Sequence, residues 1–305
     1  MKILFFGIHE IGQRSLEKLL CRDEVEIVGV VTKYDTVFQT YSVSDFAKKN
    51  HLLCYSLRFI NCQYVFNLFK KLEFDLIVVA GFHLIIPEEI LNLAKTAAIN
   101  LHDSLLPKYK GPNASKWCII NGEKKTGVTV HQMSGKIDEG KIIAQKEVEI
   151  LPVDTAGTLF SRLASIGSDL LVEVVSLIQK NTLSYLNVNG ASPTYYSYPT
   201  IDDLRIKWNL LSANQIYCLV RGLNPSPGAF FFYNNEKYKV FEMQILSSKS
   251  HLKEGTIIEL CDDYFIVSTL TWNVKINNLR KQIHSAYSIR EFIDENRLKV
   301  FDILM

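Results

Sequence analysis

The stretch Ile99-Asn100-Leu101-His102-Asp103-Ser104-Leu105-Leu106-Pro107 begins as an apolar run and ends in a loop. We interpret it as the end of a buried β-strand. Asn100 and His102 are two residues apart, and side chains with this spacing point to the same side of an extended chain. Ligands bind at the carboxyl ends of the strands in an open α/β sheet. The stretch therefore places an amide beside an imidazole where a ligand is expected.

Strands and helices alternate around this stretch. Residues 3–6 form a short apolar strand, and a glycine-containing turn over 7–12 leads to a helix that begins at Ser15. Residues 25–31 form a second strand, rich in β-branched residues. Residues 75–80 lack polar alternation, as expected for a central strand with both faces covered. These units predict an α/β fold with a Rossmann-like, mostly parallel sheet.

The composition changes near residue 181. Residues 185–204 are polar and rich in Tyr and Ser, which indicates a linker. Several short β segments follow within 229–277, and this pattern is typical of a small antiparallel barrel or sandwich. The sequence therefore predicts a catalytic domain over 1–184, a linker over 185–204 and a small β-barrel domain over 205–305.

The composition excludes several classes of protein. The 305 residues are 48% hydrophobic and 22% charged, and the net charge is +2. This charge gives no bulk electrostatic reason to expect a nucleic-acid or membrane partner. The six scattered cysteines lack metal-ligand spacing and predict reduced thiols with no metal. No apolar run reaches membrane-spanning length, and no signal peptide is evident, so we expect a cytoplasmic protein.

Three side chains are candidates for catalysis. Asn100 offers an N–H to a developing oxyanion, and His102 can move a proton near neutral pH. Asp138 lies in a polar, Gly-flanked loop, from which it could fix the tautomer of the imidazole and stabilise its cation. A structural role for a histidine at a strand end is the alternative. A metal site from His102, His131 and Asp138 is less favoured, because His131 alternates with valines and is compatible with the opposite side of its strand.

An ordered set of motifs resembles the formyltransferases that use 10-formyltetrahydrofolate. The motifs are Asn100-Leu101-His102, Ser104-Leu105-Leu106-Pro107-Lys108-Tyr109-Lys110-Gly111, Trp117, Asn121-Gly122-Glu123, Thr126-Gly127-Val128-Thr129-Val130-His131, Met133 and Asp138-x-Gly140. The C-terminal stretch Asn224-Pro225-x-Pro227-Gly228-Ala229-Phe230 is similar to the start of that family's second domain.

This resemblance implies both the fold and the chemistry. It implies a Rossmann-like catalytic domain, an OB-like C-terminal domain and formyl transfer from the folate to a primary amine. Asn100, His102 and Asp138 match the family's catalytic residues. The resemblance also implies a folate-binding segment, whose members are Phe82, His83, Leu84 and Ile85, together with Asp138.

Two branches of the family differ in the amine that they formylate. The segment over 33–41 has one Lys and neither Gly nor Pro, unlike the basic loop of the branch acting on methionyl-tRNA. The motifs are most similar to the branch that acts on UDP-4-amino-4-deoxy-L-arabinose, although Pro112 replaces an arginine of that enzyme. We therefore expect a UDP-, dTDP- or GDP-linked amino sugar, used for a cell-surface polysaccharide such as lipopolysaccharide. Lys110 and Asn113 are expected to contact it.

The alternatives come from different functional classes. One is a methionyl-tRNA formyltransferase, the only alternative in which a nucleic acid is a partner. Others are a formyltetrahydrofolate hydrolase and an inactive folate- or nucleotide-binding module. Tyr195, Tyr196 and Tyr198 could stack a base or simply pack between domains. No membrane partner is expected, and a homodimer is compatible with the sequence.

Overall fold

The computed structural model describes residues 1–33, 41–188, 192–281 and 287–305. Internal contacts divide the chain into two compact units. Unit 1 comprises 1–114, 125–149 and 160–197, and unit 2 comprises 115–124, 150–159 and 198–305. The domain limits expected from the sequence, at 184 and 205, stay predictions.

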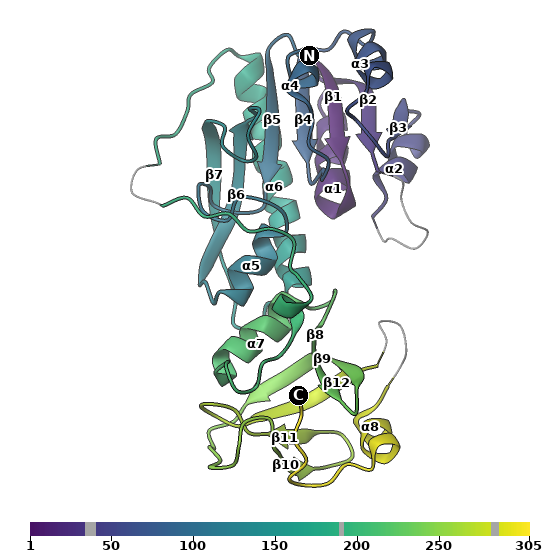
Figure 1. The fold of residues 1–305 in the computed structure, drawn as a ribbon. Coiled ribbons are helices and arrows are strands. Elements are labelled where there is room, and N and C mark those ends of the chain that lie inside the picture. Colours follow the sequence, from purple (N-terminus) through teal and green to yellow (C-terminus); the bar gives the residue numbers. More distant parts are fainter. Residues whose placement is uncertain (34–40, 189–191, 282–286) are drawn as a thin grey trace. The chain divides into compact units, whose positions relative to one another are not determined.

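Among the described residues of unit 1, seven strands form one sheet in the order β3-β2-β1-β4-β5-β6-β7 (Figure 1). Strands β1 to β5 run parallel to one another. Strand β6 runs antiparallel to β5, and β7 runs antiparallel to β6. The expectation of a Rossmann-like, mostly parallel sheet is confirmed. The strands are β1 (Lys2–Gly7), β2 (Glu26–Thr32), β3 (Cys54–Ser56), β4 (Leu76–Ala80), β5 (Ala97–His102), β6 (Lys125–Gln132) and β7 (Ile142–Glu149).

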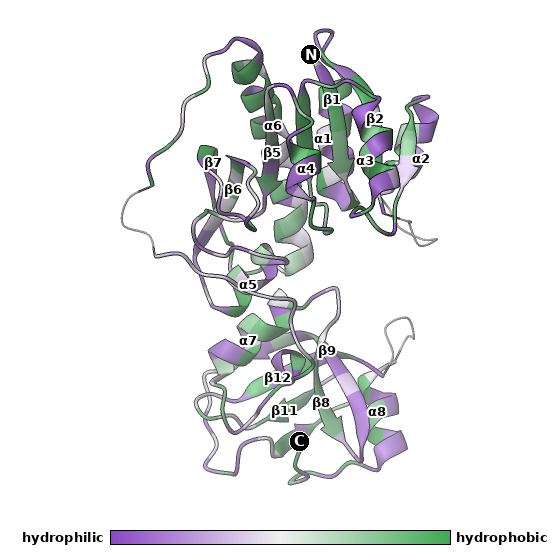
Figure 2. Ribbon diagram, turned by 45° about the horizontal axis from the view of Figure 1, so that its top comes forward, coloured by the Kyte–Doolittle hydropathy of each residue, from purple (hydrophilic) through white to green (hydrophobic). Residues whose placement is uncertain are grey.

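Helices connect these strands and cover the sheet. Those of unit 1 are α1 (His9–Leu20), α2 (Val43–Lys49), α3 (Gln63–Lys70), α4 (Glu88–Leu91) and most of α6 (Ala156–Gln179), whereas α5 (Ala114–Ile120) falls almost entirely in unit 2. Helices α3 and α4 bury their apolar side chains against alternate residues of β1 and β4. Helix α6 approaches β5 and β6 on the other face, where a Cβ on Gly167 would lie 3.0 Å from Leu101. The sheet therefore has helices on both faces, and β1 is hydrophobic along most of its length (Figure 2).

Helix α1 begins six residues earlier than the sequence indicated. The stretch over 7–12, predicted as a turn, contributes its last four residues to the helix. A Cβ on Gly12 would lie 3.0 Å from the backbone of Gly7 and 3.1 Å from the Ala80 carbonyl. The glycine therefore permits close packing of the first helical turn against β1 and β4, which local propensity does not reveal.

Unit 2 contains a curled antiparallel sheet in the order β10-β11-β12-β9-β8. Its strands are β8 (Ala229–Tyr233), β9 (Glu236–Ile245), β10 (Ile257–Leu260), β11 (Phe265–Val267) and β12 (Val274–Arg280). Helix α7 (Ala213–Gly222) begins with the capping box of Ser212 and Gln215. Helices α8 (Ile289–Asn296) and η1 (Asp202–Leu204) were not expected.

The C-terminal residues join the two edges of this sheet. Phe301 donates its N–H to the carbonyl of Ile257 in β10 (2.8 Å). Met305 exchanges two backbone hydrogen bonds with Phe232 in β8. The unpaired edges of β10 and β8 are thereby covered by one short segment. The barrel-like character of this part of the chain is confirmed, and the specific OB topology stays a prediction.

In the part of the chain that the structure describes, no helix combines the length and apolarity needed to span a bilayer.

Candidate active site

Strand β5 carries Asn100 and His102 at its carboxyl end. Its antiparallel neighbour β6 places His131 opposite Asn100 and Thr129 opposite His102. Two residues earlier on the same face, Ala98 packs into the cluster under α3 and α4. The pair therefore lies on the α3/α4 face of the sheet, beyond its apolar core, and the two side chains share one side of the strand, as their spacing predicted.

A backbone carbonyl orients His102. The Nε2 atom lies 2.8 Å from the carbonyl oxygen of Tyr109, and because a carbonyl only accepts, Nε2 carries the proton. The lone pair of the neutral ring is then on Nδ1, which lies 3.7 Å from Oδ2 of Asp138. That distance exceeds a hydrogen bond, so Nδ1 can accept a proton. The sequence suggested that Asp138 fixes the tautomer of His102. In the structure, the carbonyl of Tyr109 fixes it.

Asp138 lies between two imidazoles. Its Oδ1 is 3.5 Å from Nε2 of His131, and its Oδ2 accepts the N–H of Gly111 (2.8 Å). Burial raises the pKa of Asp138, but the positive charges that His102 and His131 carry when protonated, together with the Gly111 N–H, outweigh this effect and hold the pKa well below its usual range. The carboxylate is therefore ionised at neutral pH and can stabilise a positively charged His102.

His131, which the sequence offered only as a less favoured metal ligand, is a further member of the site. Its Nδ1 lies 3.0 Å from the carbonyl of Gln132, so Nδ1 is the protonated nitrogen of the neutral ring. Nε2 can then accept an N–H from Asn100, at 3.1 Å. This contact orients the Asn100 amide and leaves its second N–H for another acceptor. The antiparallel register of β5 and β6 was the missing information, because it turns His131 toward Asn100.

The loop after β5 is held by side chains of β6 and β7. Thr129 donates its hydroxyl to the carbonyl of Ser104 (2.6 Å) and accepts the N–H of Leu106 (3.1 Å). Gln145 donates to the carbonyl of Leu106 (2.7 Å) and to the Thr129 hydroxyl (2.9 Å). The loop that supplies the Tyr109 carbonyl is therefore fixed at its start by buried polar contacts.

The predicted folate segment lies at the carboxyl end of β4. Phe82 and Leu84 pack against the α3/α4 cluster, to which Met133 also contributes, while Ile85 is 71% exposed. Burial, together with the charges of Lys33 and His9, lowers the pKa of His83, whose Nδ1 is buried without a hydrogen-bond partner. Among the described residues, no backbone–backbone hydrogen bond involves 82–85. The segment therefore has polar groups free to bind a ligand.

The two residues expected to contact the acceptor lie in the loop between β5 and α5. Lys110 is mostly buried, and its Nζ pairs with Glu139 (3.1 Å), the residue after Asp138. Asn113 has a left-handed backbone (φ +59°) and is half-buried. Lys110 is thus linked to the loop that carries Asp138 through an ion pair, and the contact of either residue with a substrate stays a prediction.

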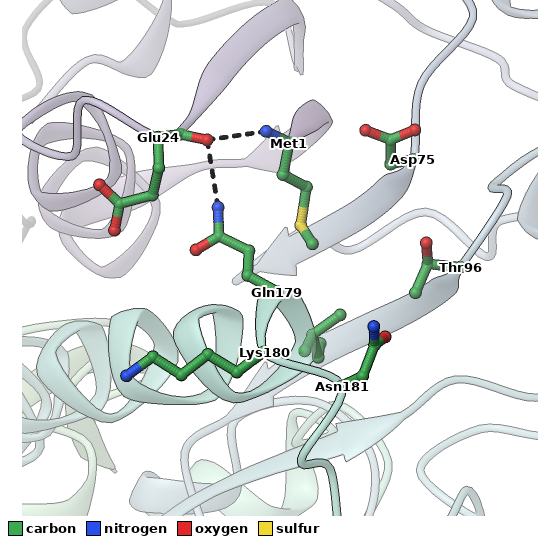
Figure 3. Close-up of a pocket in the computed structure, with 8 residues that line it drawn as sticks. Met1, Glu24, Asp75, Thr96, Gln179, Lys180 and Asn181 are labelled. Atoms are coloured by element: carbon green, nitrogen blue, oxygen red, sulfur yellow. Dashed lines mark hydrogen bonds between the residues drawn. The ribbon is translucent and has the colours of Figure 1, made fainter.

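A cavity of about 480 Å³ lies at the opposite edge of the sheet. It is lined by residues at the amino ends of β1, β4 and β5 and at the end of α6, including Met1, Asp75, Thr96 and Gln179 (Figure 3). The carbonyl of Glu24 accepts hydrogen bonds from the N-terminal ammonium (2.7 Å) and from Gln179 (3.1 Å). The cavity therefore lies away from the imidazole–carboxylate cluster.

Within the described ranges, no group of three or more His, Cys, Asp or Glu side chains is arranged to hold a metal ion. His102, Asp138 and His131 instead form a hydrogen-bonding and charge cluster beside an oriented amide. An N–H donor, an imidazole with a free nitrogen and an ionised carboxylate together suit acyl transfer to an amine.

Comparison with known proteins identifies the family. Residues 1–175 match the formyl transferase model, and residues 200–297 match the model of the formyl transferase C-terminal domain. The chain belongs to the formyl transferase family. It is therefore an enzyme that transfers a formyl group, as the sequence motifs predicted.

Relatives at the sequence level are methionyl-tRNA formyltransferases. The protein of Alkaliphilus oremlandii is 33% identical over 310 residues, covering 100% of this chain and 99% of the relative. That of Acetivibrio thermocellus is 31% identical over 313 residues, with the same coverage. Formyltransferases of this kind thus match the chain along its full length.

Solved structures with the same fold include sugar N-formyltransferases. The N-formyltransferase of Helicobacter canadensis, in complex with folinic acid and dTDP-3-aminofucose, has a TM-score of 0.69 at 23% identity. The match covers 91% of this chain and 99% of that protein. WlaRD, a sugar 3N-formyl transferase solved with dTDP and 5-N-formyl-THF, has a TM-score of 0.70 at 22% identity, with coverages of 91% and 97%. At these identities, the two structures establish the fold.

Proposed function

We propose that the enzyme transfers the formyl group of 10-formyltetrahydrofolate to the primary amine of a nucleotide-linked amino sugar. The observation that carries the transfer chemistry is the cluster of Asn100, His102 and Asp138 at the carboxyl end of β5. It combines an oriented amide, an imidazole with Nδ1 free and an ionised carboxylate.

The segment over 82–85 fits the folate. A pterin ring presents N–H and carbonyl groups along one edge, and the backbone of this segment has such groups free. The buried Nδ1 of His83 also lacks a partner, and a bound ligand would satisfy it. The two structural neighbours described above were solved with folate derivatives. We therefore infer that 82–85 and Asp138 bind the co-substrate.

The residues perform three tasks in the transfer. Asn100 donates its second N–H to the formyl oxygen as the neutral amine attacks the formyl carbon. Nδ1 of His102 takes the proton that the amine loses, and Asp138 stabilises the resulting imidazolium. As the carbon–N10 bond breaks, N10 of the folate receives this proton. The products are the N-formyl sugar and tetrahydrofolate, so atoms and charges balance.

The charge of the C-terminal region favours a small acceptor. Residues 198–305 contain 13 Lys and Arg against 12 Asp and Glu. Several of these cations have internal partners: Lys207 pairs with Asp202, and Lys275 lies over the Tyr264 ring. A protein that binds tRNA tightly neutralises many phosphates with basic side chains. The near-neutral region supports a sugar nucleotide over a tRNA.

Methionyl-tRNA is the second candidate, favoured by the full-length relatives at 31–33% identity. The segment over 33–41 has one Lys and neither Gly nor Pro, which favoured another acceptor in the sequence analysis. Of this segment, residues 34–40 lie outside the described residues. The relatives' specificity and the charge of this chain therefore point to different acceptors.

A competition assay separates these functions. Purified enzyme receives 10-formyltetrahydrofolate with methionyl-tRNA and a panel of UDP-, dTDP- and GDP-linked 3- and 4-amino sugars, and mass spectrometry follows every N-formyl product. Products formed in competition report ratios of kcat/KM. We expect one amino sugar to be formylated at least about 100-fold faster than methionyl-tRNA, a difference of roughly 2.7 kcal/mol. Preferential formylation of methionyl-tRNA, or formate release without an acceptor, would overturn the proposal.

A further inference from the structure

Part of the segment expected to be a linker makes ordered contacts with the catalytic loop. Residues 194–196, here called the strap, hydrogen-bond to residues 107–111. The N–H of Lys110 donates to the carbonyl of Thr194 (2.9 Å), and the N–H of Tyr196 donates to the carbonyl of Lys110 (3.0 Å). The hydroxyl oxygen of Thr194 accepts the N–H of Tyr109 (2.8 Å). The strap thus pairs with the loop much as a short parallel strand would.

Side-chain packing holds the two segments in one register. The rings of Tyr109 and Tyr196 stack with centroids 5.1 Å apart and planes 12° from parallel. Gly111 has φ +91°, and a Cβ there would lie 2.3 Å from the carbonyl oxygen of Tyr196. Any side chain at this position would therefore push the strap away. Position 111 therefore requires glycine for two reasons, its left-handed backbone and the closeness of the strap.

The peptide groups held by the strap also anchor the catalytic side chains. The N–H of Tyr109 donates to the strap, and the carbonyl of Tyr109 accepts from Nε2 of His102. Lys110 gives both backbone groups to the strap, and the next N–H, of Gly111, donates to Asp138. Two backbone groups of one short loop thus set the tautomer of the imidazole and the position of the carboxylate.

We propose that the strap is a positioning element for catalysis, with Thr194 as its main positioning residue. It acts on His102 and Asp138 through the 109–111 backbone, and the proposal rests on the catalytic roles given to these two residues above. The gap of 3.7 Å between His102 and Asp138 is too long for a hydrogen bond, so this pair does not orient the ring by itself. A misplacement of about 1 Å in a catalytic group can cost about 10²-fold in rate.

The test uses substitutions at Thr194 that keep its shape. Thr194→Val removes the hydroxyl that accepts the Tyr109 N–H, and we expect kcat to fall about 10- to 100-fold, with KM for the folate within about twofold. Thr194→Ser retains the hydroxyl and should restore most of the rate. Thr182→Val is the matched control, because its exposed hydroxyl donates to the Leu177 carbonyl at the end of α6 (3.3 Å), away from the strap and the catalytic residues. It should keep the wild-type kcat.

A second measurement needs no turnover. In protein labelled with ¹⁵N-histidine, with the His102 signals assigned through His102→Asn, we expect one Nε2–H tautomer in the wild type and in Thr194→Ser. Thr194→Val should show a mixture of tautomers. A Thr194→Val enzyme with wild-type kcat, or with an unchanged His102 tautomer, would overturn the role of the strap. If the wild type formylates none of the acceptors, the proposed function fails, and the tautomer measurement still decides the role of the strap.

Discussion

The two edges of the unit 1 sheet carry different kinds of site. At the amino edge, a cavity of about 480 Å³ is lined by Met1, the carboxylates of Glu24 and Asp75 and the amides of Gln179 and Asn181. At the carboxyl edge, buried His102, His131 and Asp138 lie within hydrogen-bonding or ion-pair distance of one another or of Asn100. The comparison shows that converging, oriented polar groups locate the chemistry better than open volume does. Substitutions at the two edges should therefore have very different effects.

The largest effect is expected at His102. His102→Ala removes the proton acceptor, and general-base catalysis is worth about 10²- to 10⁴-fold. We expect kcat to fall within that range, measured by N-formyl product formation with the thermal midpoint recorded in parallel. A variant that keeps near-normal turnover would show that another group takes the proton.

Asn100→Ala should have the next largest effect. The loss of one oxyanion donor typically costs about 10²- to 10³-fold in kcat. The substitution also removes the hydrogen bond to His131, so His131→Asn serves as the comparison variant. We expect His131→Asn, which removes only the contact that orients the amide, to cost less than Asn100→Ala. A near-normal kcat in Asn100→Ala would show that the amide does not hold the oxyanion.

Asp138→Asn should lower kcat about 10- to 100-fold, which is the worth of one charge-assisted interaction of roughly 1.5–3 kcal/mol. Because its pKa lies well below the usual range, Asp138 is ionised above that range and does not titrate between pH 5 and 9. The loss should therefore persist at every pH in this interval, because no protonation of Asp138 removes its charge there. A loss that disappears as the pH falls from 9 to 5, as protonation of the wild-type carboxylate would cause, would contradict the low pKa.

The smallest effects are expected at the amino edge. Thr96→Val and Gln179→Ala change the lining of the cavity without touching the catalytic cluster. Exposed substitutions usually shift stability by no more than about 0.5 kcal/mol. Turnover should stay within about twofold of the wild type. A tenfold loss of turnover in either variant would indicate that the active site lies at the cavity and not at the carboxyl edge.

The sequence predicted the parts of the molecule that depend on local pattern. The alternation of Asn100 and His102 and the apolar strand over 75–80 depend on residues close in the chain, and they led to the sheet and to the face of β5. These features need no knowledge of distant contacts.

The remaining features depend on contacts between distant residues. The position of His131 required the register of β6 against β5, and the tautomer of His102 depends on a carbonyl that no side-chain pattern reveals. The strap is polar and irregular, so its composition indicated a linker, although Thr194 and Tyr196 bind the catalytic loop. The early start of α1 similarly depends on a glycine that packs against a neighbouring strand.

A crystal structure with 5-formyltetrahydrofolate bound would locate the folate site, because this ligand carries a formyl group and resembles the proposed co-substrate. We expect the pterin along the backbone of 82–85 and the formyl oxygen within about 3.5 Å of Nδ2 of Asn100, beside His102. A ligand bound in the cavity at the amino edge, or a formyl group remote from Asn100 and His102, would contradict this expectation.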